Sequence, residues 1–124
     1  MTEVGIVIVS HSKWIAQGLV DLISEVAKDV LLTYVGGTED DGIGTSFEQV
    51  QTVVEANKAE KILAFFDLGS ARMNLELVAD FSDKDIIINN VPIVEGAYTA
   101  AALLQAGADL ATIQEQLKEL KIKK

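Results

Sequence analysis

Apolar residues along this chain form either short continuous runs or helix-spaced stripes, and the two patterns alternate. Four runs are apolar almost throughout, which is typical of strands buried on both faces of a parallel sheet. They cover residues 4–9, 30–35, 61–66 and 85–89. Between these runs, apolar residues recur every three or four positions, as on the inner face of a helix. The pattern predicts a three-layer α/β fold: an open, mostly parallel sheet of four main strands with helices on both faces.

The helical stripes predict five helices, and four of them have a start signal. Thr45 and Glu48 form a capping box, Ser70 and Asp109 are candidate N-caps, and Pro92 suits a first turn. The fourth helix, with its body at residues 96–105, has small side chains that permit close packing on the sheet or on another subunit. The inward-facing residues we expect on the other helices are Ile15, Leu19, Leu22, Ile23 and Val26; Phe47, Val50, Val53 and Val54; Met73, Leu77 and Phe81; and Leu110, Ile113, Leu117 and Leu120.

Length and composition restrict the class of protein. The chain has 124 residues, of which 49% are apolar, so we expect one folded domain over residues 1–124. No apolar run approaches the ~20 residues of a membrane span, and no leader segment precedes the first strand, which favours a soluble cytoplasmic protein. The absence of cysteine excludes disulfides and thiol catalysis. A net charge of −9 disfavours nucleic acid as a partner and suits basic proteins.

The chain's only histidine, His11, lies between two serines where the first strand ends and the first helix begins. In open parallel sheets, functional sites gather beyond the carboxyl ends of the strands, and the free N–H groups of a helix start favour an anion there. An imidazole at this position can carry a phosphoryl group. An ordinary surface histidine fits the same position, so the chemistry depends on its neighbours.

Asp67 follows the third strand as His11 follows the first. The two side chains should therefore emerge at one sheet edge and meet if their strands are neighbours. A carboxylate that accepts the imidazole Nδ1–H fixes the tautomer in which Nε2 is unprotonated. Alternatively, Asp67 only caps a turn that contains Gly69.

Two further residues are candidates at the same edge. Thr45 lies at a helix start, where its hydroxyl can face a phosphoryl group. Arg72, the only arginine, is a candidate to reach phosphate or the acids of a partner, although a solvated arginine is the alternative. The glycine-rich loop over residues 36–44 lacks the spacing of a nucleotide-binding or EF-hand loop, and we expect no metal site.

Four segments, taken together, resemble a known family. They are VSHS at 9–12, IGTSF at 43–47, DLGSA at 67–71 and NVPIVEGA at 90–97. In this order and at these spacings, they are similar to the phosphotransferase subunits DhaM of the phosphoenolpyruvate-dependent dihydroxyacetone kinases. The first domain of these subunits is related to the mannose-type IIA components of the bacterial sugar phosphotransferase system. The resemblance covers essentially the whole chain.

The resemblance implies that His11 accepts a phosphoryl group from the phosphocarrier HPr and passes it to ADP on a separate nucleotide-binding subunit, for phosphorylation of dihydroxyacetone. Asp67 matches the carboxylate that pairs with the histidine, and Ser12, Thr45 and Gly69 match positions around the phosphoryl group. A homodimer is implied, with no cofactor on this subunit because ADP and Mg²⁺ belong to the partner subunit. Some members carry HPr-like and enzyme I-like domains after this one, which here would have to act as separate proteins.

Three other functions remain open on the sequence. The nearest is a IIA component that delivers phosphate to a mannose-type sugar transporter. Another is a receiver-like signalling module phosphorylated on Asp67, but Ser10 and His11 stand where a receiver has the acidic pair that binds Mg²⁺. The last is an interaction module that accepts no phosphoryl group.

Overall fold

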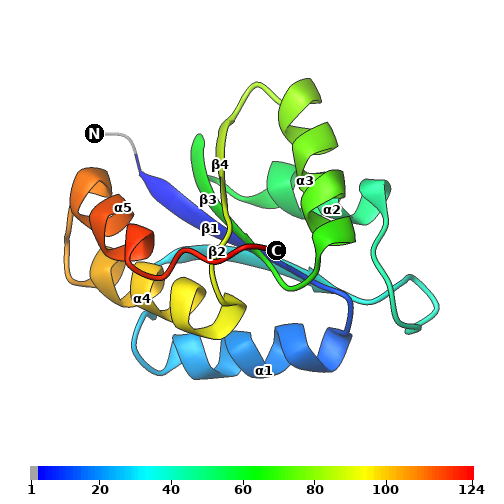
Figure 1. Ribbon diagram of the computed structural model, residues 1–124, viewed down its shortest axis with the longest axis horizontal. Coiled ribbons are helices and arrows are strands. Elements are labelled where there is room, and N and C mark those ends of the chain that lie inside the picture. Colours follow the sequence, from blue (N-terminus) through cyan, green and yellow to red (C-terminus); the bar gives the residue numbers. More distant parts are fainter. Residues whose placement is uncertain (1–2) are drawn as a thin grey trace.

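The computed structural model describes residues 3–124, which form one parallel sheet covered by helices on both faces (Figure 1). The strands are β1 (Val4–Ser10), β2 (Leu31–Gly36), β3 (Lys61–Phe66) and β4 (Asp85–Asn89). The helices are α1 (Lys13–Ser24), α2 (Phe47–Ala56), α3 (Gly69–Phe81), α4 (Ile93–Gln105) and α5 (Leu110–Lys118). The predicted fold class is confirmed.

The strand order β2-β1-β3-β4 makes β1 and β3 central neighbours, and every adjacent pair is parallel. Near the carboxyl ends of the strands, Val9 of β1 is in register with Val35 of β2 and with Phe66 of β3. The residues that follow β1 and β3 therefore leave the sheet side by side at one edge. This register is what brings position 11 and position 67 together.

Each face of the sheet has its own apolar core, because alternate residues of a strand point to opposite faces. Ile6 and Ile8 of β1 pack in the core beneath α1, α4 and α5, while Val7 and Val9 pack in the core beneath α2 and α3. All four side chains are fully buried. Figure 1 shows these two helical layers on either side of the sheet.

The small residues of α4 bring this helix close to the sheet, as predicted. Ala97, Ala100 and Ala101 are fully buried. At Gly96 an added Cβ would lie 2.2 Å from the Val91 side chain and 3.4 Å from Phe65, so no larger residue fits there without displacement.

The prediction of which residues of α3 face the sheet was wrong. Ala71, Leu75 and Val78 are buried against the sheet, whereas Met73 and Phe81 are 63% and 75% exposed and Leu77 is also exposed. Both sets of three residues have helical spacing. The set that begins with Ala71 packs against the sheet because a small residue in the first turn allows the helix to approach the sheet closely. On α1 the prediction was right for Leu19 and Ile23, but the third buried residue is Ala16, while Ile15, Leu22 and Val26 are exposed.

Three helix starts differ from the predictions. On α2 the N-cap is Ser46, not Thr45: its hydroxyl accepts from the Gln49 N–H at 3.3 Å and donates to the Gln49 side chain at 3.0 Å. On α3 the N-cap position is Leu68, without a side-chain cap bond, so Ser70 is free for another role. Pro92 occupies the N-cap position of α4, one residue before the first helical turn.

Among the helices described for residues 3–124, none has the length and apolar character needed to cross a bilayer.

Candidate active site

His11 is positioned by main-chain contacts at the turn between β1 and α1. Its carbonyl accepts a hydrogen bond from the Gly44 N–H at 2.9 Å, which ties the turn to the loop before α2. The next residue, Ser12, is the N-cap of α1 and accepts from the Ile15 N–H at 3.4 Å. Short polar caps favour a helix start at this point, and a helix start directly after a buried strand leaves the intervening side chain at the sheet edge.

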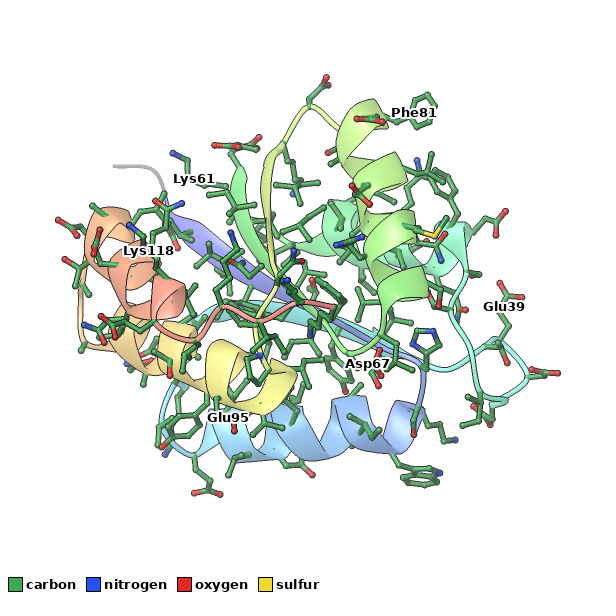
Figure 2. All side chains as sticks on the ribbon, in the orientation of Figure 1. Glu39, Lys61, Asp67, Phe81, Glu95 and Lys118 are labelled. Atoms are coloured by element: carbon green, nitrogen blue, oxygen red, sulfur yellow. The ribbon has the colours of Figure 1, made fainter. Side chains whose placement is uncertain are left out.

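Asp67 directly follows β3, and Figure 2 shows it between the first turns of α1 and α3. Its carboxylate accepts four hydrogen bonds. Oδ1 accepts from His11 Nδ1 at 2.8 Å and from the Leu68 N–H at 2.7 Å. Oδ2 accepts from the Ser10 hydroxyl at 2.7 Å and from the His11 N–H at 2.9 Å. The carboxylate is thus held against both the backbone and the ring of the same histidine.

This arrangement determines where the proton of the neutral imidazole lies. Both oxygens of Asp67 act as acceptors in this network, so Nδ1 of His11 is the donor and carries the hydrogen. Nε2 is then left with a lone pair. This is the tautomer a histidine needs to act as a nucleophile through Nε2.

Nε2 of His11 faces the hydroxyl of Ser70 on the first turn of α3, at 2.5 Å. Because Nε2 has a lone pair in this tautomer, the Ser70 hydroxyl donates the hydrogen bond. Ser70 is exposed, and the His11 and Asp67 side chains keep 14% and 13% of their surface. The site therefore lies at the surface with its inner side held by Asp67 and its outer nitrogen covered by one movable hydroxyl.

The hydrogen bonds favour the ionised carboxylate. Burial by itself raises the pKa of the Asp67 carboxyl, but hydrogen bonds from the His11 main chain and ring, the Ser10 hydroxyl and the Leu68 N–H outweigh it. The net effect holds the pKa of Asp67 below its ordinary value. Ser10 in turn accepts from the Ser12 N–H at 3.1 Å, so its hydroxyl is oriented as a donor to Asp67.

The other predicted site residues have different surroundings. Thr45 accepts a hydrogen bond from the Asn74 side chain at 3.1 Å, which ties α3 to the loop before α2. Gly69 is exposed and begins α3, and an added Cβ there would meet nothing within 4 Å. Arg72 binds the main-chain oxygen of Lys124 at 3.0 Å and lies 3.7 Å from Glu76, so its contacts in this structure are within the chain.

Three residues near the site were missed by sequence reasoning. Ser70 was interpreted as a helix cap, although its place in the DLGSA segment beside Asp67 was a usable signal. Ser10 was interpreted as a flank of His11 and as one of the two residues that replace a receiver's acidic pair, but not as a partner of Asp67, although the last strand residue shares the sheet edge. Lys124 had no local signal, because its approach to β3 depends on the path of the chain after α5.

Within residues 3–124, no three side chains of the His, Cys, Asp and Glu types come together in a way that could hold a metal ion. The chemistry available to the cluster is that of an oriented imidazole. A carboxylate holds one ring nitrogen, a serine hydroxyl stands at the other, and the first turns of two helices converge on the same edge. Such an arrangement suits reversible transfer of an anionic group to and from Nε2.

Comparison with known proteins gives the family. The model of the PTS system fructose IIA component (EIIA-man) matches residues 5–114. The phosphotransferase subunit DhaM of the PTS-dependent dihydroxyacetone kinase of Lactococcus lactis subsp. lactis is 58% identical over 120 residues, which cover 97% of this chain and 98% of that protein. The chain belongs to the DhaM family.

Two further matches agree with this DhaM assignment. The phosphoryl donor subunit DhaM of PEP-dependent dihydroxyacetone kinase 1 of Listeria innocua is 50% identical over 119 residues, or 96% of each chain. A crystal structure of a protein described as having unknown function superposes with a TM-score of 0.85 at 27% identity, covering 98% of this chain and 97% of that chain. The DhaM resemblance noted on four sequence segments is therefore confirmed over nearly the full chain.

Proposed function

We propose that this DhaM-family chain is the phosphoryl carrier of a PEP-dependent dihydroxyacetone kinase. It accepts a phosphoryl group from phosphorylated HPr on Nε2 of His11 and passes it to ADP bound on the nucleotide-binding kinase subunit. The observation that carries the proposal is the His11 ring, with Nδ1 2.8 Å from Asp67 Oδ1 and Nε2 turned to the surface. The names of the relatives, a phosphotransferase subunit and a phosphoryl donor subunit, support the same role.

In the first step, the lone pair of Nε2 attacks phosphorus in line with the bond to the donor. The new bond joins His11 Nε2 to phosphorus, and the bond that breaks joins phosphorus to the donor protein, which keeps the electron pair. The ring then bears positive charge that the ionised Asp67 stabilises through Nδ1–H. Ser70 must turn away from Nε2 for the attack, and its hydroxyl can then donate to a phosphoryl oxygen.

In the second step, a terminal phosphate oxygen of ADP attacks the same phosphorus and the bond to Nε2 breaks. The electron pair returns to Nε2 and restores the neutral ring, with its hydrogen still on Nδ1. No proton has to enter or leave His11 during the cycle, because Asp67 holds the same hydrogen bond throughout. A phosphoryl group on the imidazole is therefore easy to accept and to release.

The partners and surroundings follow from this role. ADP and Mg²⁺ bind on the partner subunit, this subunit holds no cofactor of its own, and the reaction takes place in the cytoplasm. The family resemblance favours a homodimer. Apolar side chains exposed on α3, namely Met73, Leu77 and Phe81, provide surface for protein contacts.

The receiver-like alternative fits the site poorly. A carboxylate that attacks phosphorus needs a free oxygen, but both oxygens of Asp67 accept two hydrogen bonds each. Nε2 of His11 has one contact, with a side chain that can rotate. The imidazole is the accessible nucleophile of this pair.

The test is to incubate the protein with HPr carrying a radioactive phosphoryl group. We expect a label that is stable in base and labile in acid, and no label in His11→Gln. Labelling of His11→Gln at the wild-type rate, or a label sensitive to hydroxylamine, would refute the proposal. The labelled protein is then given either the dihydroxyacetone kinase subunits with ADP or a mannose-type IIB domain. Preferential transfer to the IIB domain would favour the sugar-transport function over the one proposed.

A further inference from the structure

After α5 the chain runs back across the sheet and ends beside the active site. Figure 1 shows this segment passing over the end of β4 towards the first turn of α3. The Ile122 N–H donates to the Asn90 carbonyl at 2.9 Å, and the Arg72 guanidinium donates to the main-chain oxygen of Lys124 at 3.0 Å. These contacts fix the path of the last residues.

The side chain of Lys124 reaches the residue that precedes Asp67. Its ammonium donates a hydrogen bond to the Phe66 carbonyl at 2.6 Å and lies 4.3 Å from the centroid of the Phe66 ring. Phe66 is fully buried, so the ring and carbonyl that hold the ammonium belong to the rigid end of β3. The contact is a specific anchor, unlike a lysine extended into solvent.

The ammonium is close enough to Asp67 for their charges to interact. Burial lowers the pKa of Lys124, and the attraction of the Asp67 carboxylate raises it; burial prevails, so the pKa lies below its ordinary value. A partly desolvated cation is screened less than one in water. Its effect on a nearby carboxylate is larger than that of an exposed lysine.

We propose that Lys124 is a positioning residue for the transfer reaction, in which its anchored ammonium offsets the charge of Asp67 and holds the turn between β3 and α3. The inference rests on the proposed function, because it assigns Lys124 a part in that transfer. The reaction brings a doubly negative phosphoryl group to His11, beside an ionised carboxylate, in a protein with a net charge of −9. A cation on the Phe66 side of Asp67 reduces this repulsion.

The same contact restrains the geometry of the site. Phe66 is followed directly by Asp67, which orients the ring of His11, and Ser70 lies in the next turn. Fixing the Phe66 carbonyl therefore limits the movement of both side chains that contact the imidazole. Charged groups on the segments that meet here include Arg72 and Glu76 on α3, Lys123 on the C-terminal segment, and Lys13 of α1, which pairs with Asp41 of the loop before α2.

The kinetic test compares Lys124→Met with Lys123→Met, which removes the same charge from an exposed neighbour. We expect Lys124→Met to lower kcat for His11 phosphorylation by about threefold to tenfold, the effect of one partly screened charge, with KM for the donor protein unchanged. Lys123→Met should match wild type, and Lys124→Arg should restore most of the rate. Equal rates for Lys124→Met and Lys123→Met would overturn the inference.

A second measurement needs no phosphoryl transfer. The attraction between Lys124 and Asp67 is reciprocal, so Lys124→Met should make the Asp67 carboxyl protonate at a higher pH. The titration of this carboxyl is monitored by carboxyl ¹³C NMR. Lys123→Met should leave that titration unchanged. If wild type accepts no phosphoryl group, the proposed function fails, while the titration still decides whether Lys124 acts on Asp67. An Asp67 titration that is the same in all three proteins would overturn the role of Lys124.

Discussion

The hydroxyl of Ser70 lies 2.5 Å from Nε2 of His11, so the nitrogen proposed to receive the phosphoryl group is covered by a hydrogen-bond donor. Ser70 is on the first turn of α3, directly after the turn that contains Asp67. The two side chains that contact the imidazole thus come from one short segment. A single movement of this segment changes both contacts.

Replacement of Ser70 by alanine should slow phosphorylation of His11. The hydroxyl is expected to donate to a phosphoryl oxygen in the transition state, and loss of one such bond to a charged group costs about 1.5 kcal/mol, or roughly tenfold in rate. The measurement is the initial rate of labelling from phosphorylated HPr. Ser82→Ala is the matched control, because Ser82 lies at the other end of α3 and its hydroxyl bonds to Glu55 instead. An unchanged rate in Ser70→Ala would show that the hydroxyl only caps the free nitrogen.

Replacement of Asp67 by alanine should keep the fold but slow transfer more than the loss of Ser70. Without the carboxylate, the ring loses its orientation, its tautomer and the stabilisation of its positive charge. Groups of this kind contribute on the order of 10²-fold. The rate of labelling is measured together with circular dichroism, which checks the fold. Wild-type kinetics in a folded Asp67→Ala protein would contradict the orienting role.

Acid should remove part of the stability that Asp67 provides. The pKa of Asp67 is below its ordinary value in the folded protein, so its contribution is full above the unfolded-state value near 3.8 and is lost as the pH falls through the folded-state value. Urea unfolding of wild type and Asp67→Asn is compared from pH 7 downwards. The difference in unfolding free energy should be constant near neutral pH and shrink below about pH 4. A difference that stays constant throughout the acid range would refute this linkage.

Gly36 should tolerate no side chain. An added Cβ would lie 2.4 Å from the Ser12 carbonyl and 2.6 Å from the Lys13 Cα, both main-chain atoms at the start of α1. Gly36→Ala must displace that helix and should cost about 1–3 kcal/mol in urea unfolding, with slower labelling of His11 because its turn moves. Gly18→Ala is the control: it lies within α1 with no atom within 4 Å of the added Cβ, and should stabilise by about 0.5–1 kcal/mol. Equal stability of the two variants would contradict this account.

The central part of the site was predictable because it follows from sheet topology. Once four parallel strands are recognised, the residues after two of them share an edge, and the neighbouring positions of β1 and β3 bring His11 and Asp67 together. Their chemical roles remain proposals. The glycine and alanine content of α4 likewise predicted its close packing, because few other surfaces accept so many small residues.

The remaining contacts depend on features that a local pattern does not contain. Ser70 fits a cap and a site equally well in sequence, and only the start of α3 at Gly69 separates the two. The face of α3 was misassigned because Met73 and Leu77 have the same spacing as Ala71 and Leu75, and hydrophobicity alone favours the larger pair. Lys124 reaches β3 only through the folded path of the last residues.

Little of the His11 imidazole is exposed, and both of its ring nitrogens are hydrogen-bonded. In the proposed function, a donor protein and an acceptor protein would need this same exposed part of the ring, so the two could not bind at the same time. Each complex would have to dissociate before the next one forms. The rate of phosphoryl transfer through this subunit would then depend on how quickly the complexes dissociate. Tight binding to either partner would then be a disadvantage.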